Sequence, residues 1–180
     1  MQLNIPNFIT IARVMSVPVI FWLLISGEHT TAFYVFLAAG ISDALDGFLA
    51  KRFNWRTPLG AVLDPMADKL LLVSLFIALG VSKELPLWIV LAVVSRDILI
   101  VLAVLISWVM DQPVAIRPLA VSKANTFAQI TLVATVLADQ AFGLGLGGVR
   151  MALVWITGTL TLLSLAAYLQ AWFTHMTKAS

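Results

Sequence analysis

Four aspartates lie within two long apolar segments of this chain, where a charged side chain is costly to bury. Asp43 and Asp46 are three residues apart, so in a helix they would lie on one face. The same holds for Asp64 and Asp68, which are four residues apart. The polar, proline-containing segment 52–58 between the pairs is typical of a turn. Both pairs lie at nearly equal distances along the chain from the middle of this turn, so an antiparallel helical hairpin would bring all four carboxylates to one level.

Four carboxylates at one level in a poorly hydrated environment need cations to compensate their charge, or else some of them must take up protons. Sets of oxygen ligands suit hard divalent cations. The chain has no cysteine, which excludes thiolate metal sites and disulfides. We therefore expect a site for Mg²⁺ or Mn²⁺ whose ligands are Asp43, Asp46, Asp64 and Asp68.

Composition indicates an all-α, polytopic membrane protein, because 61% of the residues are hydrophobic, only 11% are charged, and the mean hydropathy is +1.01. Six apolar segments are each near the roughly 20 residues that a helix needs to cross a bilayer. No Gly/Ser-rich or Pro-rich linker divides them, so residues 1–180 are expected to form a single membrane domain. The six predicted transmembrane helices are 6–27, 31–52, 58–82, 86–110, 118–141 and 148–174.

The distribution of Lys and Arg predicts how these helices are oriented. The 51–56 connection carries three of these cations and the 111–123 connection carries two, whereas the opposite side carries few and also has acidic residues. The positive-inside rule therefore places both termini, the aspartates and an active-site cavity on the cytoplasmic side. The N-terminus lacks a basic region before its first apolar run, so we expect no cleaved signal peptide. We also expect no transit peptide, which favours a bacterial inner membrane over a mitochondrial one.

The first predicted helix begins with a polar stripe of Asn7, Thr10 and Arg13, spaced three residues apart. One interpretation is capping at the membrane interface, with an arginine whose charged end reaches the headgroups. The alternative is a functional surface at the cytoplasmic end of the helix. The residues alone leave both interpretations open.

Two further polar groups lie in the fourth and fifth predicted helices. Arg96 lies near mid-depth beside Asp97, and adjacent residues do not face each other on a helix, so we expect its partner to be the acidic cluster or a lipid phosphate. Lys123, Thr126 and Gln129 descend the fifth helix at three-residue steps. They would form a cationic wall facing the metal site, or else a lysine reaching the interface and a threonine bonded to its own helix backbone.

The hairpin sequence resembles the signature of the CDP-alcohol phosphatidyltransferases. The match consists of Asp43-x₂-Asp46-Gly47-x₂-Ala50-Lys51-x₈-Gly60-x₃-Asp64-x₃-Asp68. One position departs, because the arginine usual after the alanine is Lys51 here, which keeps the charge but loses the bidentate fork. The resemblance extends to the opening 4–13, to Ser-Arg-Asp at 95–97 and to Ser-Lys-x-Asn-Thr at 122–126, and so covers nearly the whole chain.

The resemblance implies a six-helix membrane enzyme, usually a homodimer, that binds CDP-diacylglycerol and two Mg²⁺ or Mn²⁺ ions among membrane lipids and takes no nucleic acid. Asp43, Asp46 and Asp64 would ligate metal, and Asp68 would share in ligation or act as the catalytic base. The glycines would leave space where the hairpin admits a nucleotide. The predicted nucleotide-binding residues are Asn7, Thr10, Asp46, Gly47, Ala50, Lys51 and Gly60, and the predicted acceptor or lipid-phosphate residues are Arg13, Arg96, Lys123 and Asn125.

The acceptor alcohol is predicted from the cations that this chain lacks. Family members that use glycerol 3-phosphate typically have a second arginine about two turns after the one in helix 4, and a second lysine in helix 5. This chain has Val104 and Asn125 at the corresponding positions. A less cationic pocket suits the singly charged phosphodiester of phosphatidylglycerol, so we favour cardiolipin as the product. Glycerol 3-phosphate, which would give phosphatidylglycerophosphate, is the alternative, and serine or inositol phosphate would fit less well.

A transporter of divalent ions is a hypothesis from a different class, because intramembrane aspartates also occur in ion pathways. Transporters often have repeated halves, yet the aspartate pattern has no second copy in 90–180. A purely structural cluster is disfavoured, because burying four acids costs stability without compensation.

Overall fold

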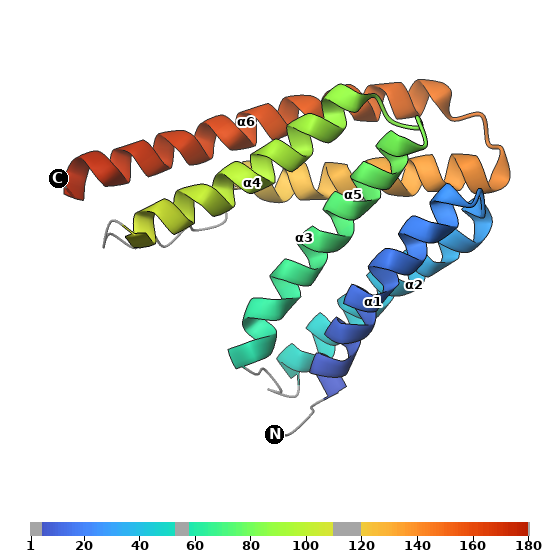
Figure 1. Cartoon of the computed structure of the whole chain (residues 1–180), viewed down its shortest axis with the longest axis horizontal. Coiled ribbons are helices and arrows are strands. Elements are labelled where there is room, and N and C mark those ends of the chain that lie inside the picture. Colours follow the sequence, from blue (N-terminus) through green and yellow to red (C-terminus); the bar gives the residue numbers. More distant parts are fainter. Residues whose placement is uncertain (1–4, 53–57, 110–119, 180) are drawn as a thin grey trace. The chain divides into compact units, whose positions relative to one another are not determined.

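Helices account for nearly all of the described backbone. The computed structural model describes residues 5–52, 58–109 and 120–179, and within these ranges it has six α-helices and no strand (Figure 1). Side chains are described in the same ranges except at 5–11, 13, 43–67, 104–105, 108, 175–176 and 178–179. The helices are α1 (Ile5–Ile25), α2 (His29–Arg52), α3 (Pro58–Val81), α4 (Leu87–Val109), α5 (Ala120–Phe142) and α6 (Gly147–Ala179).

The six predicted segments are confirmed as helices, and most of their boundaries agree to within two residues. The largest difference is at the C-terminus, where α6 continues to Ala179 instead of ending at 174. The polar residues that end the apolar run also suit a solvated helix, so hydropathy alone places the end of α6 too early.

Two of the helix ends share a capping geometry that requires a left-handed residue. Gly27 follows α1 with a φ of 80°, and Lys83 follows α3 with a φ of 61°. The amides of Gly27 and Glu28 bond back to the carbonyls of Leu24 and Leu23, at 3.2 and 2.9 Å. This is the Schellman pattern, which satisfies the last carbonyls of a helix. Lys83 and the residue after it make the equivalent pair of bonds at the end of α3.

The connection between α5 and α6 is a glycine turn. Gly143 and Gly145 have φ values of 62° and 69°, a backbone region that residues with a side chain rarely adopt. These glycines therefore let the chain reverse within four residues, 143–146, before α6 begins.

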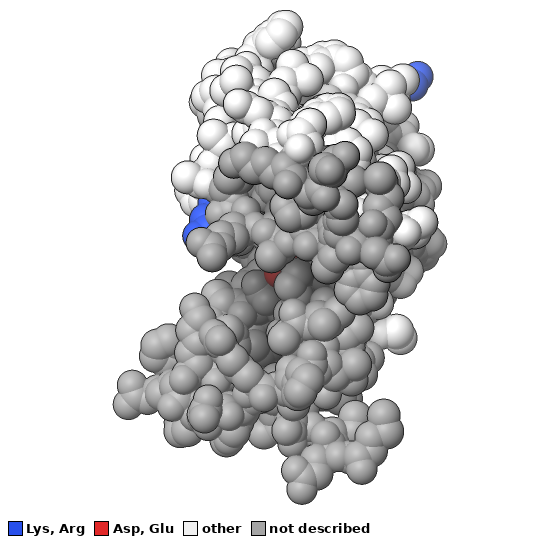
Figure 2. All heavy atoms as spheres, turned by 90° about the vertical axis from the view of Figure 1, so that its left-hand side faces the viewer, with Lys and Arg blue, Asp and Glu red and all other residues white. Residues whose placement is uncertain are grey.

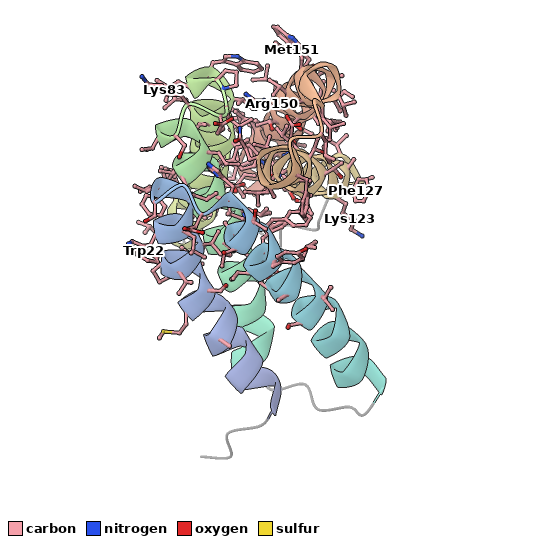
Figure 3. The ribbon with its side chains drawn as sticks, turned by 90° about the vertical axis from the view of Figure 1, so that its right-hand side faces the viewer. Trp22, Lys83, Lys123, Phe127, Arg150 and Met151 are labelled. Atoms are coloured by element: carbon pink, nitrogen blue, oxygen red, sulfur yellow. The ribbon has the colours of Figure 1, made fainter. Side chains whose placement is uncertain are left out.

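The backbone divides into two compact units, and the first comprises Met1–Glu84 with Ala134–Gly145. In it, α1 packs against both α2 and α3. The N-terminal end of α1, the C-terminal end of α2 and the N-terminal end of α3 lie at the same end of this bundle (Figures 1 and 3). The opposite end is closed by the last residues of α5, where the ring of Phe142 packs edge-on against Phe33 at 5.3 Å. There Gln140 also donates a hydrogen bond to Glu84. The core of the first unit includes Ile20, Leu24, Ala32, Phe36, Leu75, Phe76, Leu79, Val136 and Leu137.

The second unit comprises Leu85–Val133 with Leu146–Ser180. Trp88 packs against Trp155 at 5.2 Å near the start of α4 and α6, and Trp172 donates to Ser107 at 2.8 Å near their ends. These contacts show that α4 and α6 run in the same direction. The N-terminal part of α5 packs against both helices through its polar residues. The apolar core of this unit includes Leu85, Ile89, Val90, Val93, Ala128, Leu132, Val133 and Val154.

The described surface is unusually apolar. Large hydrophobic side chains are exposed on all six helices, and Trp22 and Phe127 reach 65% and 73% exposure. Figure 2 shows one face on which almost all described side chains are uncharged. Within the described residues, the segment Gly147–Thr174 is the one helix that passes a combined test of length and apolarity for crossing a membrane. Only 28% of its most apolar window is buried, so it does not resemble the core helix of a soluble protein.

Candidate functional site

The bounds of α2 and α3 place the four aspartates at the predicted distances from the 53–57 connection. Asp46 lies six residues before the end of α2 at Arg52, and Asp64 lies six residues after the start of α3 at Pro58. At 1.5 Å per residue, each is about 9 Å along its helix from the connection. Asp43 and Asp68 are nine and ten residues from the same helix ends, or about 14–15 Å. Each aspartate of α2 therefore has a counterpart in α3 at a similar distance from the 53–57 connection.

The carboxylates themselves are described for one member of this set. Asp68 is half-buried. The side chains of Asp43, Asp46 and Asp64 lie outside the described residues, so their convergence stays a prediction. Among the side chains that are described, no three Asp, Glu, His or Cys groups gather into a metal-binding cluster.

The residues predicted to bind the nucleotide belong to three helix ends that lie together in the first unit (Figure 1). Asn7 and Thr10 are in the first turns of α1, Gly47 is near the end of α2, and Gly60 is in the first turn of α3. Ala50 and Lys51 are in the last turn of α2, and Arg13 is in the first half of α1. The side chains of all these residues lie outside the described part, and their roles stay predictions.

Arg96 has its charge partner next to it in the sequence. Its guanidinium forms an ion pair with Asp97, so the expectation that these neighbours do not meet is wrong. The backbone of a helix does point adjacent side chains apart, but the long arginine stem can bend back to its neighbour. Arg96 is 3% exposed, and it also donates to Ser122 at 2.7 Å and Ser164 at 2.8 Å.

Arg96 therefore joins three helices, since Ser122 is on α5 and Ser164 is on α6. Its guanidinium carbon also lies 5.7 Å from the ring centre of Tyr168 on α6, within cation–π range. The partner predicted from the sequence was an acid of the hairpin or a lipid phosphate. The partners that the structure gives are all within the second unit.

The polar residues of α5 do not form one continuous wall. Lys123 is exposed and points away from α5 beside Phe127 (Figure 3), whereas Gln129 is only 2% exposed. Six helical residues correspond to about 240° of rotation between 123 and 129, which puts these two side chains on different faces. Thr126 donates to the backbone carbonyl of Ser122 at 3.1 Å, as the alternative interpretation predicted.

Asn125 lies on the buried face of α5. It is fully buried, and its side-chain oxygen accepts a hydrogen bond from Thr161 of α6 at 2.9 Å. Ser122, which accepts a hydrogen bond from Arg96, is one helical turn before Asn125 on α5. Arg96 and Asn125 therefore take part in the same three-helix packing, at neighbouring levels. Lys123, the third acceptor residue predicted in this unit, faces outward instead.

The sequence interpretation missed the polar face of α6. That helix was taken as an apolar span, yet four of its polar residues recur at spacings of four, three and four, which is one helix face. This spacing was the available signal. The residues are Thr157, Thr161, Ser164 and Tyr168, of which the first three are at most 1% exposed.

The sequence matches the profile of a known protein family. The sequence profile of the CDP-alcohol phosphatidyltransferases matches residues 3–163, which include the four aspartates of α2 and α3 as well as Arg96 and Ser122. The chain belongs to the CDP-alcohol phosphatidyltransferase family.

Its relatives fall into two groups by name. The chain is 33% identical to human cardiolipin synthase (CMP-forming) over 155 residues, 77% of this chain and 52% of the human protein. It is 35% identical to the CDP-diacylglycerol–glycerol-3-phosphate 3-phosphatidyltransferase of Pseudomonas fluorescens over 187 residues, 97% of this chain and 92% of that protein. The Escherichia coli protein of the same name is 32% identical over 179 residues. The chain spans about half the length of the human cardiolipin synthase, and neither group is clearly nearer.

Proposed function

We propose that this protein transfers the phosphatidyl group of CDP-diacylglycerol to a glycerol hydroxyl and releases CMP. The observation that carries the proposal is the register of the aspartate hairpin, in which each aspartate of α2 has a counterpart in α3 at a similar distance from the turn. Family membership supports it, since both groups of relatives carry names of enzymes that act in this kind of transfer.

The residues of the hairpin fit a pair of divalent metal ions. Asp43, Asp46, Asp64 and Asp68 supply only carboxylate oxygens, which are the ligands that Mg²⁺ and Mn²⁺ prefer. When bound, the two ions would neutralise the diphosphate and the leaving CMP. Asp68 is suited to a second role as the base that takes the proton of the acceptor hydroxyl, because it is half-buried at the inner limit of the hairpin.

The nucleotide is proposed to lie across the helix ends that meet in the first unit. Gly47 and Gly60 would leave space for the cytidine, with Asn7 and Thr10 of α1 beside it. Lys51 would contact phosphate as a point charge, since it lacks the bidentate geometry of the arginine usual at this position.

Phosphatidylglycerol is the favoured acceptor, which makes the proposed product cardiolipin. The charge of Arg96 is already compensated by Asp97, and Asn125 is neutral and bonded to Thr161. These contacts support a pocket of low net charge, which suits a phosphodiester better than the doubly charged phosphate of glycerol 3-phosphate. Arg13 and Lys123 are the remaining cations proposed to contact lipid phosphate.

Glycerol 3-phosphate stays the second candidate acceptor, with phosphatidylglycerophosphate as its product. The observation in its favour is that the two bacterial relatives named for this reaction, from Pseudomonas fluorescens and Escherichia coli, are matched over 92% and 96% of their own length. The human cardiolipin synthase is matched over 52% of its length.

We also propose that the chain crosses a bacterial inner membrane six times as one domain and works as a homodimer, with both termini and the active-site cavity in the cytoplasm. Three observations support the membrane part of this proposal. Exposed apolar side chains occur on every helix, Gly147–Thr174 could span a bilayer, and α4 and α6 run in the same direction, as alternating spans require.

The test is to incubate the purified protein with CDP-diacylglycerol and each acceptor separately, and to identify the products by mass spectrometry. We expect CMP release with cardiolipin from phosphatidylglycerol. Phosphatidylglycerophosphate as the main product would select the second candidate. Divalent-ion flux in liposomes without CMP release would instead support the transporter hypothesis.

A further inference from the structure

A seam of buried polar side chains lies along the contact between α5 and α6. Arg96 of α4 bonds to Ser122 on α5 and to Ser164 on α6 at the same level. One turn further along α5, Asn125 accepts its hydrogen bond from Thr161, which is one turn back along α6. These two levels fix α5 and α6 as antiparallel neighbours and define their register.

The same register predicts a third level, formed by Gln129 and Thr157. Each is four residues beyond the second level, in opposite directions along the two antiparallel helices. Gln129 is 2% exposed and Thr157 is fully buried. Neither Nε2 of Gln129 nor Oγ1 of Thr157 has a hydrogen-bond partner in the described structure.

Two more groups of the seam have unused hydrogen-bonding capacity. Nδ2 of Asn125 and Nε of Arg96 are buried and have no partner among the described atoms, although other atoms of both side chains are bonded. The seam therefore presents unpartnered groups from three helices within a few turns of one another. Buried polar groups in folded proteins are nearly always bonded to the protein or to ordered water.

We propose that the seam binds water molecules, held by Arg96, Asn125, Gln129 and Thr157. Water fits because it can accept from the amide and guanidinium groups and donate to the threonine hydroxyl. An anion is disfavoured, because the charge of Arg96 is compensated by Asp97 and the other three groups are neutral. Beyond Gln129, α5 continues with the buried apolar residues Leu132 and Val133, which close the seam at that end.

Solid-state NMR of the full-length protein in phospholipid bilayers tests this directly. With ¹⁵N-labelled glutamine and asparagine, magnetisation transfer from water is expected at the side-chain amides of Gln129 and Asn125 despite their burial. The Gln129→Met and Asn125→Leu variants assign the two signals by removing them. If neither amide received magnetisation from water, the proposal would be overturned. Inorganic phosphate is expected to leave both signals in place, and a phosphate-dependent shift would overturn the assignment to water.

Thermal unfolding of the Thr157→Val variant gives an independent readout. A dry seam would gain stability from this change, because an unpartnered hydroxyl would be replaced by a methyl group of similar shape. A hydrated seam would lose a water contact, so we expect the unfolding midpoint to fall by about 2–4 °C. Thr159→Val is the matched control on the exposed face of α6, and its midpoint is expected to stay unchanged. An unchanged or raised midpoint for Thr157→Val would contradict the proposal.

Discussion

Arg96 illustrates what a single residue contributes to this protein. A buried guanidinium without partners would be strongly destabilising, and here Asp97, Ser122 and Ser164 supply the partners from three helices. Removal of one partner would leave this buried charge less compensated. The positions of α4, α5 and α6 therefore depend on one another through Arg96.

At Lys83, the structure predicts a stabilising substitution. Its φ of 61° is costly for a residue with a side chain, so Lys83→Gly is expected to raise the free energy of unfolding by about 0.5–1 kcal/mol. Lys83→Ala removes the same charged side chain but keeps the backbone strain, so it serves as the control and should give no such gain. The measurement is the thermal midpoint in detergent, and equal midpoints for the two variants would contradict the strain argument.

Asp68 is the residue that separates binding from chemistry. Asp68→Asn keeps the size of the side chain but removes its ability to take a proton, so the variant is expected to bind CDP-diacylglycerol and fail to release CMP. Binding can be followed by isothermal titration and turnover by CMP release. Normal turnover would exclude the proposed role as base.

At the scale of elements, the α2–α3 hairpin is the unit that carries the proposed chemistry. α2 ends at Arg52 and α3 begins at Pro58. The number of residues from these ends, together with the rise of a helix, therefore sets the distance of each aspartate from the connection. The sequence predicted these helices and this register because the spacing is local. The convergence of side chains across the hairpin depends on helix rotation, which local spacing does not determine.

Removal of one hairpin carboxylate should abolish turnover without unfolding the protein. Asp64→Ala is expected to lower CMP release by at least about 10³-fold, since it would remove a metal ligand and leave the remaining charges poorly compensated. Asp139→Ala, near the opposite end of the first unit, is the matched control and should retain activity. Substantial turnover by purified Asp64→Ala protein would contradict the metal-site proposal.

The contact between α4 and α6 depends on a residue without a side chain. A Cβ at Gly158 would lie 2.7 Å from the ring of Trp88, well inside normal contact distance. Gly158→Ala is therefore expected to lower the free energy of unfolding by about 1–3 kcal/mol through overpacking. Gly148→Ala is the control, because nothing lies within 4 Å of its Cβ position. Equal thermal midpoints for the two variants would show that Trp88 adapts at little cost.

At the scale of the whole molecule, the acceptor is the main open choice between the two proposed reactions. Val104→Arg restores one of the cations typical of members that use glycerol 3-phosphate, so it should raise the ratio of glycerol 3-phosphate to phosphatidylglycerol use. Product ratios by mass spectrometry, with Val104→Leu as the control, measure the change. A ratio that did not move would weaken the charge argument for the acceptor.

The sequence by itself determined the features that depend on local spacing. It predicted six helices with nearly correct ends, the distances of the four aspartates from the ends of α2 and α3, and the family. The tertiary structure alone decided which side chains meet between distant helices. It paired Arg96 with Asp97, Ser122 and Ser164, turned Lys123 outward, and buried Gln129 and Thr157 at one contact. The physical reason is that helix rotation and pairing are set by packing over the whole contact, which no short stretch of sequence encodes.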